Sequence, residues 1–257
     1  MPEGDTILWA ATRIRPVLVG HPIEVAHTHV RFAKDRWPER LGGHTVAAVE
    51  THGKNLFIVF DNDLLLHSHL RMTGAWDVRP VGGRWRRAAR RAWLVLRAGE
   101  NEVVEYDGPV LELMTAARRR FDQRLAALGP DVLADHFDAP AFLRRLRSTD
   151  PQRTLGDALL DQRILAGIGN IWKAESCWEA ALDPWRRLST LTDEQALALV
   201  EGIRPRMLIS GTQGHRAVPS RIYGRAGRPC PRCGALIRAR GQGDENRTTY
   251  WCPGCQH

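Results

Sequence analysis

The chain has 257 residues, of which 37 are Lys or Arg and 29 are Asp or Glu, giving a formal net charge of +8 and a pI of about 9.8. With 43% hydrophobic and 26% charged residues, the composition is that of a folded protein and excludes disordered tails and fibres. No apolar run approaches the roughly 20 residues that cross a bilayer, so we expect a cytoplasmic protein without a membrane partner. The positive balance suggests a polyanionic partner, although many basic proteins bind none.

The first predicted element is a helix over residues 5–18, with Asp5 as its N-cap. Apolar residues spaced three and four apart form one stripe along this helix: Ile7, Ala11, Ile14 and Leu18. Pro16 should bend or end the helix, because proline lacks the backbone N–H that a helix interior needs.

Beyond Gly20 the pattern changes to short runs rich in β-forming residues, separated by turn residues at hairpin distances. The runs are 23–25, 46–50, 55–60, 64–70, 92–97 and 102–106. They predict antiparallel sheet packed as a sandwich. Between two of the runs, residues 81–91 hold five arginines, which form either a solvated loop or a loop that contacts phosphates.

From Gly129 onward the pattern becomes helical, so the boundary between the two halves should lie near residues 120–130. Helices are expected over 139–147, 154–163, 170–181 and 192–209. The last opens on Thr192 and Gln195, spaced as a capping box, and Pro205 should kink it. Residues 224–257 are rich in Gly, Arg and Cys, which suits a small unit held together by a metal.

Four of the five cysteines form two Cys-x2-Cys pairs: Cys230 with Cys233, and Cys252 with Cys255. Four thiolates can surround one Zn²⁺ tetrahedrally, and the 18 residues between the pairs suffice for the hairpin of a zinc ribbon. Disulfides are the less favoured alternative in a chain with no export signal. Because four cysteines leave no open coordination position, we expect one structural zinc per chain. The fifth cysteine, Cys177, is more often buried filler than a nucleophile.

Residues 158–175 predict two helices joined by a turn that holds Gly167 and Gly169, with Asn170 opening the second helix. Such a turn exposes free backbone N–H groups at the positive end of a helix dipole, and these groups can form a binding site for phosphate. On the alternative interpretation, Asn170 simply caps its own helix.

Pro2 and Glu3, at the start of the chain, could act as a catalytic amine and its neighbouring acid. Removal of Met1 would leave Pro2 as a secondary amine able to attack a carbonyl carbon and form an iminium ion, with Glu3 beside it. From composition alone, Pro2 and Glu3 are better interpreted as a stiff start and an acid that suits the helix dipole. Lys54, in a tight turn between two apolar strands, is most often only a surface lysine.

Six segments then follow one another from the first residue to the last: MPEG at 1–4, the Gly53-Lys54 turn, HLRMTG at 69–74, LLDQRILAGIGNIW at 159–172, YGRAGRPC at 223–230 and RTTYWCPGCQH at 247–257. Together they resemble the formamidopyrimidine-DNA glycosylase and endonuclease VIII family. Its members are base-excision repair enzymes that are both DNA glycosylases and abasic-site lyases. The match covers the whole chain.

The resemblance implies an α+β fold of three parts: a catalytic antiparallel β-sandwich flanked by helices at 1–125, a helical domain with a helix-two-turns-helix motif at 126–222, and a zinc-ribbon finger at 223–257. Double-stranded DNA containing an oxidised base or an abasic site would lie in the cleft between the domains. The damaged nucleotide would be extruded from the stack, because a base buried in a duplex cannot otherwise be reached.

The resemblance also assigns roles to individual residues. Pro2 would attack C1′ of the damaged nucleoside and leave an iminium link to the opened sugar, with Glu3 as the acid/base group. Loss of a C2′ hydrogen would then cut the strand by β-elimination, followed by δ-elimination. Lys54 would support catalysis and contact phosphate. The reaction would need no redox cofactor and no Mg²⁺.

Asn170 and Arg247 match the family pair that holds the DNA backbone around the extruded nucleotide, so the zinc would serve to position Arg247. Met72 matches the residue inserted into the gap left in the duplex, although the usual fate of Met is core filler. Two departures stand out: Asp5-Thr6 replace the Pro-Glu of many members, and the other two gap-filling residues have no match.

Gly4, where the purine branch usually has Leu, and the ending YWCPGCQH both favour the endonuclease VIII branch, whose substrates are oxidised pyrimidines. The alternatives are an enzyme specific for 8-oxoguanine and formamidopyrimidines, and a zinc-ribbon protein that binds DNA without catalysis. We expect a monomer that is cytoplasmic and associated with the nucleoid.

Overall fold

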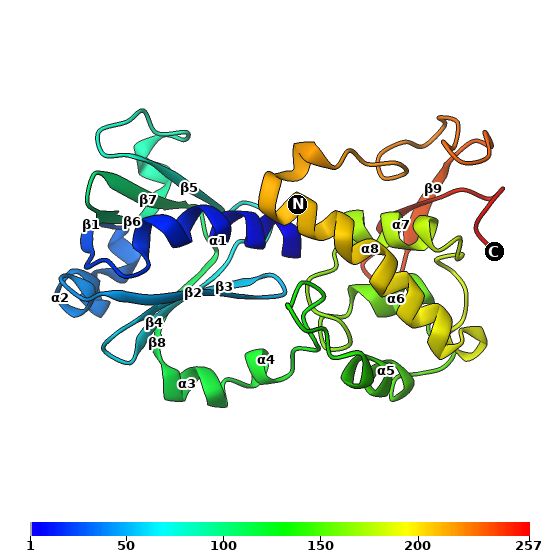
Figure 1. Cartoon of the computed structure of the whole chain (residues 1–257), viewed down its shortest axis with the longest axis horizontal. Coiled ribbons are helices and arrows are strands. Elements are labelled where there is room, and N and C mark those ends of the chain that lie inside the picture. Colours follow the sequence, from blue (N-terminus) through cyan, green and yellow to red (C-terminus); the bar gives the residue numbers. More distant parts are fainter. Residues whose placement is uncertain (1) are drawn as a thin grey trace. The chain divides into compact units, whose positions relative to one another are not determined.

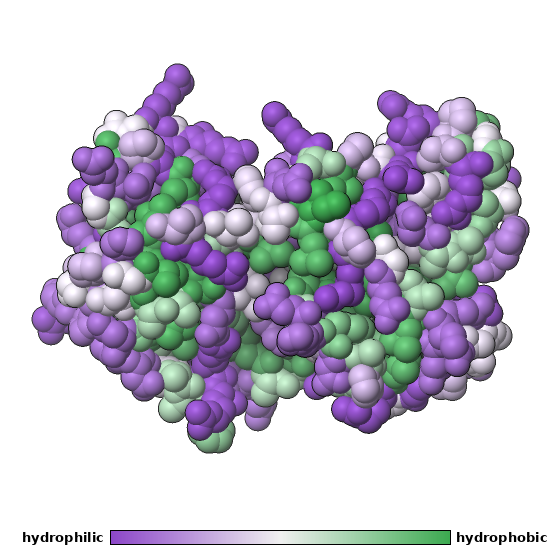
Figure 2. Space-filling model, viewed as in Figure 1, coloured by the Kyte–Doolittle hydropathy of each residue, from purple (hydrophilic) through white to green (hydrophobic). Residues whose placement is uncertain are grey.

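The computed structural model describes residues 2–257, which divide into two compact units (Figure 1). Unit 1 comprises Pro2 and Thr6–Ala126, and unit 2 comprises Glu3–Asp5 and Ala127–His257. Hydrophilic side chains cover much of the face shown in Figure 2. Among the described residues, no helix has the length and apolarity that crossing a bilayer requires.

Unit 1 contains two four-stranded antiparallel sheets, with strand orders β1-β6-β7-β5 and β2-β3-β4-β8. The strands are β1 Glu24–Thr28, β2 Val46–His52, β3 Asn55–Phe60, β4 Leu64–His69, β5 Ala75–Pro80, β6 Ala92–Ala98, β7 Asn101–Tyr106 and β8 Val110–Thr115. The helical elements are α1 Gly4–Leu18, η1 Val30–Asp35, α2 Trp37–Leu41, η2 Ala89–Arg91, α3 Ala116–Phe121 and α4 Gln123–Ala126. One apolar core is shared by the two sheets and α1, which confirms the predicted antiparallel sandwich flanked by helices.

The six predicted strands are all present, whereas β5 and β8 were not predicted. Strand β5 carries Asp77 and Arg79, which interrupt the apolar pattern. In the fold these two side chains form an ion pair of 2.5 Å between Arg79 Nη2 and Asp77 Oδ2, so their charges are tolerated at low exposure. A local pattern cannot report such tertiary compensation.

Helix α1 buries its predicted stripe, since Ile7, Ala11, Ile14 and Leu18 are fully buried. The expectation that Asp5 is its N-cap is wrong. The helix begins at Gly4, and the Asp5 carboxylate accepts a hydrogen bond of 2.5 Å from Ser210 Oγ. Pro16 lies in the last turn, and the helix ends two residues later at Leu18.

Unit 2 is mainly helical and ends in an antiparallel hairpin. Its elements are α5 Ala139–Arg147, α6 Leu155–Leu160, α7 Asn170–Glu179, η3 Leu188–Thr190, α8 Asp193–Gln213, η4 His215–Ala217, β9 Arg238–Gln242 and β10 Arg247–Trp251. The predicted capping box between Thr192 and Gln195 opens α8, which continues beyond Pro205. Helix α6 is shorter than predicted because Asp161 ends it.

Glu105 on β7 is fully buried inside unit 1. The backbone of Gly108 approaches it so closely that a Cβ at that position would lie 1.5 Å from Glu105 Oε1, so a side chain there would displace the Glu105 carboxyl group. Burial raises the pKa of Glu105 to about 8, against the opposing effects of a backbone hydrogen bond from Gly108 and the charge of Arg87. The folded state therefore holds this carboxyl group protonated at neutral pH.

We expect Glu105→Gln to remove a pH dependence of stability. With a folded pKa of about 8 against an ordinary 4.5, Glu105 contributes stability fully below about pH 4.5 and loses that contribution as the pH rises towards 8. The Gln variant should therefore melt at a higher temperature than wild type at about pH 9 and close to it at about pH 4. Calorimetry at both pH values tests this, and a melting difference independent of pH would contradict it.

Candidate functional site

The amino-terminal end of α7 is occupied by the carboxylate of Glu3. Glu3 Oε2 accepts hydrogen bonds from Gly169 N at 3.0 Å and Trp172 N at 3.2 Å, and Oε1 accepts one from Ile171 N at 2.8 Å. A Cβ at Gly169 would lie 2.4 Å from Glu3 Cδ, so a side chain here would displace the Glu3 carboxylate from the helix. The prediction of an open phosphate-binding site is therefore wrong, because the carboxylate of Glu3 itself occupies these amides. The helix dipole favours its negative charge.

Asn170 does not cap its own helix, since Gly169 is the N-cap residue and the free amides of that end donate to Glu3. Instead, Asn170 Nδ2 donates a hydrogen bond of 2.7 Å to the carbonyl of Thr248, the residue after Arg247 on β10. Asn170 is 6% exposed. This contact joins the start of α7 to the strand that carries Arg247.

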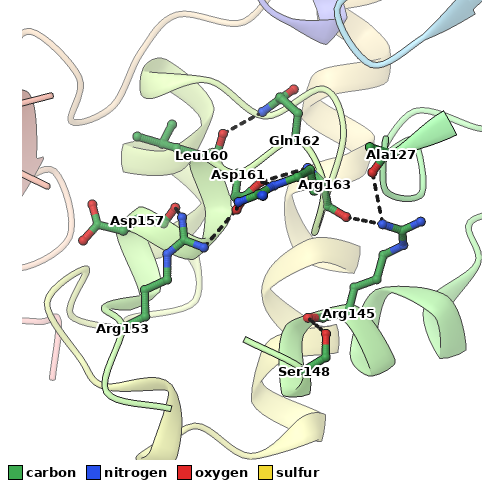
Figure 3. Close-up of polar contacts among 9 residues, drawn as sticks. All are labelled: Ala127, Arg145, Ser148, Arg153, Asp157, Leu160, Asp161, Gln162 and Arg163. Atoms are coloured by element: carbon green, nitrogen blue, oxygen red, sulfur yellow. Dashed lines mark hydrogen bonds and ion pairs between the residues drawn. The ribbon is translucent and has the colours of Figure 1, made fainter. Parts of the chain in front are cut away.

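The turn between α6 and α7 is held by its own side chains and by Arg153, which precedes α6 (Figure 3). Asp161 binds Arg163 at 2.7 Å and Arg153 at 2.9 Å. The Arg163 guanidinium, with Arg153, holds the pKa of the Asp161 carboxyl well below its ordinary value. Gln162 Nε2 donates to the carbonyls of Leu160 and Ile168, both at 2.9 Å. These bonds fix the backbone that presents the first residues of α7.

The four paired cysteines converge at the base of the β9–β10 hairpin, with their Sγ atoms within 4.8 Å of one another. Cys230 and Cys255 Sγ are 3.8 Å apart, and Cys233 and Cys252 Sγ are 3.3 Å apart. A tetrahedron of thiolates about 2.3 Å from one Zn²⁺ has edges of about 3.8 Å, so the cluster fits a metal of this kind. Trp178 Nε1 donates to Cys230 Sγ at 3.3 Å, as outer partners of metal thiolates do.

Cys177 lies apart from this cluster. It is fully buried on α7, and burial raises the pKa of its thiol to about 12. A thiol that stays protonated and shielded from solvent is not a nucleophile, which confirms the interpretation of Cys177 as buried filler.

Removal of the metal should loosen the carboxy-terminal hairpin without unfolding the sandwich. The hairpin buries few apolar side chains, whereas the sandwich has a large core of its own. We expect a chelator to expose roughly the last 30 residues to protease while unit 1 remains resistant. Limited proteolysis followed by mass spectrometry tests this, with added Zn²⁺ as the control; an unchanged cleavage pattern would argue against a structural metal.

Lys54 lies in the turn between β2 and β3, where Gly53 has a φ of 58°. It is half-buried rather than a freely exposed lysine. The sequence did not single out His69, which lies nearby at the end of β4. Burial, followed by the charges of Arg71 and Lys54, lowers the pKa of His69 to about 4. His69 Nδ1 accepts a hydrogen bond of 3.1 Å from Arg71 N and so stabilises the following turn.

That turn presents Met72, which is 65% exposed between β4 and β5. The interpretation of Met72 as core filler is therefore wrong. The arginine-rich segment 81–91 forms a loop that ends in η2, and it reaches the same turn. Arg87 Nη1 donates to the Thr73 carbonyl and to Asp107 Oδ2, both at 2.7 Å. This arginine supports the turn rather than projecting into solvent.

Arg247 is the first residue of β10 and is directly opposite Gln242 in the hairpin register. Its side chain is 36% exposed and forms an ion pair with Glu245. It lines a cavity of about 650 Å³ in unit 2, in which Arg153, Arg163 and Arg187 alternate with carboxylates. An anion entering this cavity would meet several guanidinium groups.

The predicted residues are thus divided between the two units. Pro2, Lys54 and Met72 belong to unit 1. Glu3, Asn170, Arg247 and the four cysteines belong to unit 2, where the first three gather at the start of α7 and the adjoining hairpin. Met1, whose removal the predicted chemistry of Pro2 requires, lies outside the described residues.

Comparison with known proteins identifies the family. The formamidopyrimidine-DNA glycosylase N-terminal domain matches residues 1–122, and the formamidopyrimidine-DNA glycosylase H2TH domain matches residues 128–214. The chain is 39% identical to the Streptomyces coelicolor protein named "Probable endonuclease 8 2", over all of this chain and 94% of that protein. The chain belongs to the formamidopyrimidine-DNA glycosylase family. It is also 34% identical to a Mycolicibacterium smegmatis protein named "DNA-(apurinic or apyrimidinic site) lyase Nei2", over 100% of this chain and 99% of that one.

Solved structures have the same fold. A Lactococcus lactis formamidopyrimidine-DNA glycosylase in complex with DNA containing an abasic site superposes with a TM-score of 0.82, at 23% identity and over 99% of both chains. MutM in complex with DNA containing carbocyclic 8-oxo-G superposes with a TM-score of 0.81, at 22% identity and over both chains completely. The predicted α+β architecture of this family is thereby confirmed.

Proposed function

We propose that this protein excises oxidised pyrimidines from double-stranded DNA through an iminium intermediate on Pro2, and that it cuts the strand by β,δ-elimination. The reaction class follows from the family: the chain is a DNA glycosylase and abasic-site lyase of base-excision repair. The observation that carries the residue assignment is the capture of Glu3 by three amides of α7. Because Glu3 is fixed, the adjoining Pro2 nitrogen is restrained as well.

The chemistry requires removal of Met1, which frees the Pro2 nitrogen. Its lone pair attacks C1′ while the bond from C1′ to the base breaks, and the base leaves with a proton. The Glu3 carboxylate takes up the proton that the Pro2 nitrogen loses after its attack and delivers it to the sugar ring oxygen, so that the ring opens and C1′ becomes an iminium carbon. Loss of a proton from C2′ then expels the 3′ phosphate, and a second elimination expels the 5′ phosphate. Lys54 supports these steps and neutralises a nearby phosphate.

In the same proposal, Asn170 and Arg247 hold the DNA backbone around the extruded nucleotide, and Met72 fills the gap that remains in the duplex. The exposure of Met72 supports this role, because a side chain inserted into DNA must be accessible in the free protein. One zinc bound by Cys230, Cys233, Cys252 and Cys255 would hold the hairpin and thus Arg247. It would perform no chemistry itself, and no redox cofactor or Mg²⁺ is needed.

The proposed domain organisation is 1–125, 126–222 and 223–257, in a monomer that acts in the cytoplasm at the nucleoid. The preference for pyrimidines has two supports. Several relatives carry the name endonuclease 8, among them an Escherichia coli protein 32% identical over both full lengths. In addition, a Cβ at Gly4 would lie 3.0 Å from Gly167 Cα, so the Leu of the purine branch would fit here only if the backbone at Gly167 shifted.

Borohydride trapping tests the chemistry. Reduction in the presence of a duplex containing thymine glycol should yield a covalent protein–DNA adduct, because an iminium ion is reduced to a stable amine. Pro2→Gly and Glu3→Gln should lower the yield by about 100-fold or more. Mass spectrometry of the mature terminus must first show that Met1 is absent, since an acylated Pro2 nitrogen cannot react.

Matched duplexes distinguish the alternatives. Faster single-turnover release of thymine glycol and dihydrouracil than of 8-oxoguanine supports the pyrimidine preference, and the reverse order would assign the chain to the purine branch. If the wild-type protein with a free terminus binds these duplexes but gives no adduct and no cleavage, the chain is a DNA-binding protein without catalysis.

Arg247→Ala should weaken DNA binding and make it less sensitive to salt. Loss of one phosphate contact lowers the slope of log K against log salt concentration by about 0.9. Fluorescence anisotropy on a duplex with a non-cleavable abasic analogue, at several salt concentrations, measures this slope. Replacement of the exposed Arg216 in the same way serves as a control for the loss of one positive charge in unit 2. An unchanged slope in Arg247→Ala would remove this arginine from the clamp.

A further inference from the structure

Lys173 is a buried ammonium group that the proposed chemistry does not use. The chain holds only three lysines, Lys34, Lys54 and Lys173, against 34 arginines. Lys173 lies on α7, one turn after Asn170, and is 0% exposed. Burial lowers the pKa of its amine to about 8, which reflects the cost of keeping a charge away from water. Since no DNA atom can reach it, Lys173 is not itself a catalytic amine.

The hydrogen bonds of Lys173 lead to both strands of the zinc hairpin. Its Nζ donates to Thr249 Oγ1 on β10 at 2.5 Å and to Gln242 Oε1 on β9 at 3.5 Å. Thr249 Oγ1 donates to Gln242 Oε1 at 2.8 Å. Gln242 Nε2 in turn donates to Thr154 Oγ1 at 3.0 Å and to the Pro184 carbonyl at 2.8 Å. One buried polar network thus joins α7, the hairpin and the segment before α6.

This network surrounds the position of Arg247. Gln242 is the register partner of Arg247, and Thr249 is two residues further along the same strand. Side chains two apart on a strand share a face, so Lys173 anchors the face from which Arg247 projects. The titratable groups that act on the amine are the neutral thiol of Cys177 on α7 and the charged groups of Asp157 on α6, Arg247 on β10 and Glu3.

We propose that Lys173 is a positioning residue, whose buried ammonium fixes the zinc hairpin against α7 so that Arg247 and Asn170 grip the same stretch of DNA backbone. This inference rests on the proposed function, in which those two residues form the clamp. An ammonium group suits the task because its hydrogen bonds to two neutral oxygens are charge-assisted and therefore stronger than neutral ones. An apolar side chain of the same length would fill the space without fixing the hairpin.

The stability of a variant separates positioning from a merely structural role. Replacing the buried ammonium by an apolar side chain of similar volume removes its desolvation cost, and Thr249 Oγ1 still donates to Gln242 Oε1. We therefore expect Lys173→Met to keep its bound zinc and to melt at or above the wild-type temperature. The same variant should cleave abasic-site DNA about ten-fold more slowly at subsaturating concentration, because a displaced contact costs rate. Lys173→Arg, which retains charge and donors, should recover part of that loss, and Lys34→Met on the surface should behave as wild type.

The salt dependence of binding then tests whether Lys173 acts through Arg247. In Lys173→Met the log–log slope should fall by about 0.9, as for Arg247→Ala, and the double variant should show no further fall. Additive losses would overturn the inference, as would an unchanged slope or a rate loss that merely follows a lower melting temperature or lost zinc. If Lys173→Met does not fold, Thr249→Val removes the nearer acceptor, and the same comparisons apply. A failed clamp is recognised separately, because Arg247→Ala alone would then leave the slope unchanged.

Discussion

The carboxylate of Glu3 at the start of α7 is the interaction on which the rest of the site depends. It provides acceptors for three amides that would otherwise have no intrahelical partner, and it does so from the other end of the sequence. The approach is close enough that a side chain at Gly169 would displace this carboxylate. Helix geometry therefore determines where Glu3 lies, and the peptide bond between Pro2 and Glu3 transfers that restraint to the neighbouring nitrogen.

The contacts between the hairpin and α7 form a second set, next to the contact of Glu3 with the α7 amides. A thiolate cluster closes one end of the hairpin, while the bond from Asn170 to the Thr248 carbonyl and the buried lysine hold its strands against the helix. The cysteine cluster and the polar bonds therefore have different roles. The four cysteines gather the ends of the short carboxy-terminal segment, and the polar bonds set the position of its strands relative to α7.

Sequence patterns predicted the elements that depend on the spacing of residues within a short segment. The stripe of α1, the capping box of α8 and the spacing of the cysteines each report a short-range requirement, and each is present in the structure. They did not predict the partner of the α7 amides, because Glu3 lies 166 residues from Gly169. For the same reason Asp5 looked like a cap, and the ion pair that tolerates charge in β5 could not be anticipated. His69 and Lys173 carried no pattern signal at all.

The scarcity of lysine has a practical consequence for labelling. Amine-directed reagents do not modify guanidinium groups, so in this arginine-rich chain they have few targets besides the terminus. Lys173 is shielded, and Lys34 is exposed on η1, which leaves the half-buried Lys54 as the informative site. The extent of Lys54 acylation, measured relative to that of Lys34, would thus report whether DNA covers the single turn that holds Lys54. Proteins with many surface lysines do not allow a measurement confined to one turn.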